Sequence, residues 1–240
     1  MTEQHKAKMS GDKVMLAQHA LEVRHEPSGS FLDVRGYVAD YIRNAGHFPH
    51  WKIDSNVVTF RDMPERVKKD GAYAGYKGAA YFVYNAETRN YFVDKASSFW
   101  KVLLKNEHYK VPKAIRFGCR TLVFVPTDLS FDDINKLIFR TLFTDKAQSF
   151  VDGKETDLQF VIEFNQDQFQ VRMSGGPLHE NEAPKYMRFE SDYFKKCGLF
   201  LDIDYYKTKD LDHSTIIKLL HDAVELSWSK IEKISNSLGL

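Results

Sequence analysis

The sequence predicts an α+β fold in which two diverged β-α-β-β-β-α units build one curved antiparallel sheet with helices on one face. Three observations lead to this prediction. Several segments alternate apolar and polar residues with the period of a half-buried strand, helical stripes lie between them, and the order of these elements recurs in the second half of the chain. We expect the two units to form one compact domain.

The first unit, residues 15–110, follows a polar arm over residues 1–14. Its first strand places Leu21 and Val23 on one face and charged residues on the other. Glycines between positions 71 and 78 match no phosphate-binding fingerprint, and we expect them in a loop between strands. In order, the predicted elements are strand 18–26, helix 30–46, strands 56–61, 78–84 and 91–93, and helix 97–105.

The second unit, residues 111–240, repeats this order. Ser130 has the position and chemistry of an N-cap for its first helix. The polar stretch 174–196, which contains glycines and prolines, predicts a long loop. In order, the predicted elements are strand 115–125, helix 131–143, strands 158–164, 169–173 and 198–206, and helix 212–237.

Two matched positions favour an internal duplication. Pro27 and Phe31 lie about 100 residues before Pro126 and Phe131, at corresponding places in the two units. Such a duplication would form a saddle like that of TATA-box-binding-protein-like folds, a comparison that concerns topology only. The alternative is that this order of elements recurs by chance, as it does in many α+β domains.

The overall charge and the cysteines limit the classes of function. Lys and Arg total 34 against 33 Asp and Glu, so no global field would attract nucleic acid or an anionic membrane. Cys119 and Cys197 have neither metal-binding nor redox spacing, which predicts reduced, buried thiols in a cytoplasmic protein. No segment has the length of a membrane span, and none has the pattern of a secretion signal.

Alternation along two strands of the second unit brings four charged residues to one face of the sheet. Arg116 and Arg120 would share that face with Asp202 and Asp204 if the two strands are neighbours. One interpretation is a ladder of salt bridges that needs neither metal nor cofactor. The other is a Mg²⁺ site in which both aspartates hold the metal against a phosphate. Since no phosphate-binding loop accompanies these residues, the sequence favours the ladder.

We expect the sheet face opposite the helices to be the binding surface. Its mixture of charges suits a protein partner or a small polar ligand better than nucleic acid, which would require an excess of Lys and Arg. A face that only contacts water is the alternative. The predicted outward residues are Glu22, Arg24, Arg116, Arg120, Gln159, Glu163, Gln170, Arg172, Asp202 and Asp204.

The C-terminal helix carries a second candidate surface. Its apolar residues step by three and four from Ile216 to Leu238, and Trp228 falls outside that stripe. Trp228 could therefore anchor a protein partner or a homodimer, because aromatic residues are favoured at the centres of interfaces. The alternative is that a broad sheet buries a wide face of this helix.

Three short motifs carry a family resemblance. The strand Arg116-Phe117-Gly118-Cys119-Arg120 follows an aromatic pair, Phe99 and Trp100. Leu199, Asp202 and Asp204 then form an L-x-x-D-x-D strand before a helix with an early His221. Together these motifs resemble an uncharacterised family of sporadically distributed bacterial proteins, although Thr121 and Val123 stand where that family's pattern has Tyr and Asn. The resemblance implies a bacterial origin and the patchy occurrence of mobile or defence-linked genes.

These observations predict a non-catalytic binding or regulatory protein, such as one component of a bacterial defence or toxin-antitoxin module. No serine lies in a G-x-S-x-G motif and neither cysteine has a base at readable spacing, so covalent hydrolysis has no support. The rival prediction is a metal-dependent enzyme acting on nucleotides or nucleic acid. It would use Asp202 and Asp204 for Mg²⁺ and Arg116 or Arg120 for phosphate.

Overall fold

A single antiparallel sheet organises the chain. The computed structural model describes residues 14–240 except 87, 152 and 154–155, so the predicted arm lies almost wholly outside the described residues. Within them, nine strands follow the order β2-β3-β4-β5-β1-β6-β9-β8-β7. The strands are β1 (Leu16–His25), β2 (His50–Ile53), β3 (Val57–Arg61), β4 (Asp70–Gly75), β5 (Gly78–Tyr84), β6 (Ala114–Pro126), β7 (Phe160–Gln166), β8 (Phe169–Leu178) and β9 (Gly198–Lys207).

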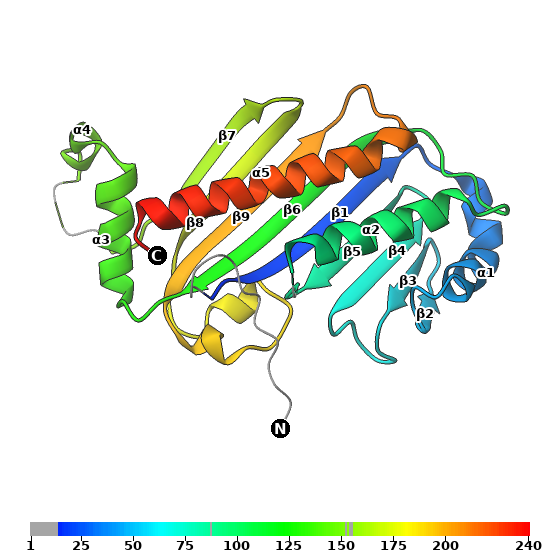
Figure 1. Ribbon diagram of the computed structural model, residues 1–240, viewed down its shortest axis with the longest axis horizontal. Helices are drawn as coiled ribbons and strands as arrows, with labels where there is room; N and C mark the ends of the chain where they lie inside the picture. The colour runs from blue at the N-terminus through cyan, green and yellow to red at the C-terminus, as the bar shows by residue number, and fades with distance from the viewer. Residues whose placement is uncertain (1–13, 87, 152, 154–155) are drawn as a thin grey trace.

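The helices cover one face of this sheet. Figure 1 shows α2 and α5 running across that face, with α1 at one end of the molecule and α3 at the other. The prediction of an α+β protein with one antiparallel sheet is thus confirmed. The helices are α1 (Gly29–Asn44), α2 (Arg89–Leu104), α3 (Phe131–Leu142), α4 (Asp145–Gln148) and α5 (Ile216–Ser237), with short 3₁₀ turns η1 (Ala183–Lys185), η2 (Asp192–Lys195) and η3 (His213–Thr215).

Alternation along the central strands separates the core from the opposite face. Every second residue of β9, from Leu199 to Tyr205, is fully buried against the helices. Cys119 in β6 lies in the same layer, and both cysteines are buried and free, as predicted. Ser130 caps α3 by accepting a hydrogen bond from the N–H of Asp133, which confirms its predicted role. The long strands, and the residues that each of them buries, agree closely with the prediction from the sequence.

Two predictions for the first unit are wrong. Residues 91–93 form the first turns of α2 instead of a strand, and their apolar side chains continue a helical stripe through Phe99 to Leu103. The glycine-containing segment expected as a loop is strand β4, which a tight turn joins to β5. Gly71 is required there because a Cβ atom would collide with the ring of Phe82 in β5. A short β2 at the sheet edge was also not predicted.

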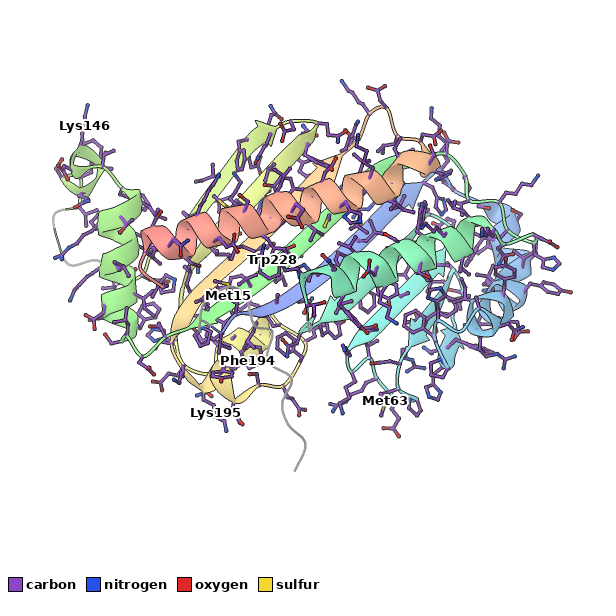
Figure 2. All side chains as sticks on the ribbon, viewed as in Figure 1. Met15, Met63, Lys146, Phe194, Lys195 and Trp228 are labelled. Carbon is purple, nitrogen blue, oxygen red and sulfur yellow. The ribbon has the colours of Figure 1, made fainter. Side chains whose placement is uncertain are left out.

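The predicted loop 174–196 is irregular only in part. β8 extends to Leu178, and residues 179–197, which we call the cover segment, then fold over one end of the sheet face that the helices leave open. Figure 2 labels Phe194 in this segment. Phe194 and Met187 form a second, smaller apolar core with Leu122, Phe124 and Phe200. The cover segment therefore closes one end of the open face.

Candidate functional site

The four predicted charged residues come together on the open face. Arg120 holds Asp202 with two hydrogen bonds, from Nε to Oδ1 at 2.8 Å and from Nη2 to Oδ2 at 2.6 Å. Arg116 donates from Nη2 to Asp204 Oδ2 at 3.0 Å. Two-point contacts between guanidinium and carboxylate are the strongest form of this pairing. The residues form the salt-bridge ladder that one interpretation of the sequence predicted.

The pairs run diagonally across β6 and β9. Directly opposite Asp204 lies Arg120, which instead binds Asp202. Gly118 permits the pairing of Arg116 with Asp204, because the guanidinium of Arg116 lies over the position that a Cβ of Gly118 would occupy, with Nη1 2.6 Å from it. The same guanidinium lies 5.2 Å from the centre of the Tyr206 ring. A glycine in mid-strand thus lets a distant arginine reach across the sheet.

Glu22 in β1 extends the ladder to the first unit. Its Oε2 accepts hydrogen bonds from Arg116 Nη1 at 3.2 Å and from Arg24 Nε at 2.9 Å. Its Oε1 accepts from the Tyr73 hydroxyl at 3.0 Å. Burial, and then the charge of Glu22, raise the pKa of Tyr73, which keeps this hydroxyl a donor. We call Glu22, Arg24, Arg116, Arg120, Asp202 and Asp204 the central ladder.

The ladder's electrostatics do not favour a metal site. Burial raises the pKa of Asp204 above its ordinary value, and Arg116 and Arg120 offset part of that rise. Hydrogen bonding to Asp202 raises the pKa of Arg120. Both oxygens of Asp202 accept from Arg120, so a cation would have to displace that arginine. Among the described residues, no group of three or more His, Cys, Asp or Glu side chains could hold a metal ion.

A pocket of about 360 Å³ lies at the end of the ladder that holds Arg120 and Asp202, and β6, β8, β9, the start of β7 and the cover segment form it. Three arginines, Arg120, Arg172 and Arg188, line it together with a single carboxylate, that of Asp202. Its remaining lining residues are Gln18, Leu122, Gln159, Phe160, Val161, Ser174, Gly175, Gly176, Pro177, Leu178, Tyr186 and Phe200. The pocket therefore carries a local positive excess that the nearly neutral whole chain conceals.

Close backbone approaches form the walls of this pocket. Gly176 lies under the chain that precedes β7, where a Cβ atom would collide with the carbonyl oxygen of Leu158. On the opposite side, the N–H of Arg188 donates to Gln18 Oε1 at 3.2 Å and fastens the cover segment to β1. Burial raises the pKa of Tyr84, and the nearby positive charge of Arg188 offsets part of that rise. Main-chain groups therefore take part in the packing of both walls.

Arg172 was predicted at this face, and Arg188 was not. Arg172 in β8 lies opposite Asp204, but it pairs instead with Glu163 at a long distance, with Nε 3.6 Å from Oε1. Both partners are about half exposed or more, so this pair restrains Arg172 little. Arg188 escaped prediction because it belongs to the expected loop. The only signal in the sequence was its place among apolar residues, between Met187 and Phe189.

Trp228 does not belong to this surface. Figure 2 labels it on α5, on the helix side of the sheet, and its side chain is only 3% exposed. Its ring makes an edge contact with His19 of β1 at 5.4 Å, and the guanidinium of Arg89 lies 5.6 Å from its centre. The suggestion that Trp228 anchors a partner or a homodimer is wrong, because the sheet buries a wide face of α5.

Comparisons of this chain with models of protein families, with curated proteins and with solved structures find no match. Among the described helices, none combines the length and the apolar character that crossing a membrane requires.

Proposed function

We propose that this chain is a non-catalytic binding protein that recognises a small, negatively charged polar ligand on the open face of its sheet. The observation that carries the proposal is the pocket in which three arginines face one carboxylate beside the central ladder. Ligand pockets are typically concave, partly apolar, and lined by a few converging polar groups. This pocket has that character, with Leu122, Leu178 and Phe200 among its lining residues.

The ladder supports the pocket instead of competing for the ligand. Asp202 fixes one edge of the Arg120 guanidinium, so the arginine reaches the pocket in one orientation. Elsewhere on the face, Glu22 and Asp204 neutralise Arg24 and Arg116. A nucleic-acid backbone would find few uncompensated cations along such a surface. A compact anion finds them in the pocket.

Native mass spectrometry of the untagged protein, purified gently from its own host, tests this proposal. We expect a low-mass adduct on the wild-type chain and its loss in Arg172→Gln and Arg188→Gln. An adduct that both variants retain would place the ligand elsewhere. A macromolecular partner that binds both variants and wild type equally, without any small adduct, would support protein recognition on another surface and contradict the pocket.

The alternative function is a metal-dependent enzyme that uses Asp202 and Asp204 with Mg²⁺. Arginines already bind both carboxylates, so a metal ion would have to displace them. Calorimetric titration with Mg²⁺ and Mn²⁺ is expected to give no saturable heat. Saturable heat that Asp202→Asn abolishes, or nucleotide turnover that Asp204→Asn abolishes, would make the enzyme the better account.

Three broader predictions accompany this proposal. We infer that the two units are diverged copies, and one feature supports it: the first strand of each unit pairs with the last, β1 with β5 and β6 with β9. We also place the protein in the cytoplasm, which two free, buried cysteines favour. The resemblance to a patchily distributed bacterial family suggests a defence module. Challenge of gene-bearing and gene-deleted cells with phage and plasmids would test that setting.

A further inference from the structure

Building on the proposed function, we propose that the pocket takes a phosphate monoester attached to a flat ring, for which a nucleoside monophosphate is the simplest probe. Two groups of side chains in the pocket point to the two ends of such a molecule. The arginines provide the site for the anionic end. Tyr186 and Phe200 provide the site for the ring.

The charge of the pocket matches a phosphate monoester. The three arginines exceed the single carboxylate by two charges, and a phosphate monoester carries about −1.5 to −2 at neutral pH. Arg120 binds Asp202 through Nε and Nη2, so its Nη1 takes part in neither of these two hydrogen bonds. Arg172 is 49% exposed and only weakly paired, so it can turn toward an anion. Guanidinium groups also match the geometry of phosphate oxygens.

The ring end lies on the cover segment. Tyr186 is 45% exposed although it is a large aromatic residue, and its ring lies 4.9 Å from that of buried Phe200 at an angle of 36°. Phe200 supports one side of the Tyr186 ring, and Phe200 is itself fixed because it belongs to β9 and to the second core. An aromatic side chain anchored on one side and exposed at a pocket is a stacking platform for a flat ring.

Polar side chains lie between these two ends. Gln18, Gln159 and Ser174 line the pocket along with the arginines. The amide oxygen of Gln18 accepts from the Arg188 N–H, so its NH₂ group is oriented as a donor. These groups suit the hydroxyls of a sugar or the polar edge of a base. The same arrangement would leave a bare apolar ring or a long hydrocarbon anion with unpaired polar neighbours.

Isothermal titration at low, fixed salt with four nucleoside monophosphates, ribose 5-phosphate, adenosine and inorganic phosphate tests the two-ended site. We expect at least one monophosphate to bind about tenfold or more tightly than ribose 5-phosphate, which lacks the ring, and than adenosine, which lacks the charge. Equal affinity for a monophosphate and for inorganic phosphate would refute the stacking platform. No saturable binding of any monophosphate at millimolar concentration would refute the inference outright.

Variants assign the two ends. Arg188→Gln and Tyr186→Ala should each weaken the best monophosphate about tenfold or more, and only the first should weaken inorganic phosphate. Arg43→Gln and Tyr37→Ala on α1 are matched controls, because they are exposed on the helix side and are expected to change nothing. Loss of affinity in the controls alone, or no loss in the pocket variants, would contradict the assignment.

The ligand comparison on the wild-type chain decides the question even if a pocket variant fails to fold. It also separates this inference from the proposed function. A native adduct that depends on Arg172 and Arg188 but is not a ring-bearing phosphate would keep the binding function and refute the nucleotide-like ligand. The absence of both an adduct and any affinity would refute both.

Discussion

Arg116→Met removes the cation at the centre of the ladder and is expected to destabilise the fold. Methionine keeps most of the side chain's length and apolar contact but leaves two carboxylates without their shared partner. Asp204 loses its 3.0 Å hydrogen bond, and Glu22 keeps Arg24 and Tyr73. The unpaired charge is therefore mainly that of Asp204.

The expected cost lies between those of surface and buried ion pairs. Two charges about 4 Å apart attract by about 4 kcal/mol at an effective dielectric constant near 20, and most of that gain is offset by desolvation. Exposed pairs contribute about 0 to 1 kcal/mol, while breaking a buried pair costs about 3 to 5 kcal/mol. Here Arg116, Asp204 and Glu22 are 22%, 26% and 30% exposed. We therefore expect a loss of about 2 kcal/mol at neutral pH.

The pH dependence identifies the group responsible. Burial raises the folded-state pKa of Asp204 above its ordinary value of 3.8, so its ionisation opposes folding. Stability is therefore greatest when Asp204 is protonated and falls as pH rises through the window between the two pKa values. Without Arg116 the folded-state pKa rises further, which widens this window. The cost of Arg116→Met should consequently be larger at pH 7 than at pH 4.

Urea denaturation followed by tryptophan fluorescence at both pH values measures this cost, provided the m-value is unchanged. The double variant with Asp204→Asn should recover about 1 to 2 kcal/mol, since it removes the unpaired charge. Arg24→Met, on an arginine that binds the same Glu22 but is 56% exposed, is the control and should cost under about 0.5 kcal/mol. A cost that is equal at pH 4 and pH 7, or a coupling near zero, would refute this reasoning.

Three further predictions concern packing and protonation. Trp228→Ala should lower the free energy of unfolding by about 3 to 5 kcal/mol without changing the sedimentation mass, whereas a changed mass would restore an interface role. Gly176→Ala should cost about 1 to 3 kcal/mol in the same unfolding assay, while Gly36→Ala in α1, where a Cβ meets open space, should gain up to about 1 kcal/mol. Burial lowers the pKa of His19 from 6.5 to about 4 in the folded chain. Between these two values the unfolded chain binds a proton that the folded chain does not, so stability falls as pH drops from about 6.5 to about 4. In His19→Asn this acid-side slope should flatten by about 1.4 kcal/mol per pH unit, and an unchanged slope would assign the dependence to another group.

The faces of the long strands could be predicted because a strand's side chains alternate strictly. β6 and β9 are long enough for the period of two to be unambiguous, so Arg116, Arg120, Asp202 and Asp204 were placed correctly. The pairing of Arg116 with Asp204 could not be predicted in the same way. It depends on Gly118, whose missing side chain lets Arg116 lie across the strand, and alternation alone carries no information about such a diagonal reach.

Short apolar runs and irregular segments were predicted poorly for a different reason. Residues 91–93 fit a strand or a helix equally well, and the helix prevails because the stripe continues through Phe99 toward the sheet. The cover segment has few regular elements, so its packing rests on scattered apolar residues such as Met187 and Phe194. A pattern based on periodicity cannot detect them. Arg188 lies in this segment, so the sequence pattern predicted neither Arg188 nor the pocket that it lines.

The pocket shows how a chain with almost no net charge can carry a local excess of positive charge. In the ladder, each carboxylate is bound by an arginine from a neighbouring strand, so the centre of the face is neutral. The cover segment adds Arg188 to the lining that already contains Arg172, and no carboxylate other than that of Asp202 lines the pocket. The positive excess thus arises from tertiary structure, since the two arginines come from β8 and from the segment that folds over one end of the open face. Any substitution that detaches the cover segment, while leaving the sheet intact, should therefore abolish the anion binding that we propose without disturbing the ladder.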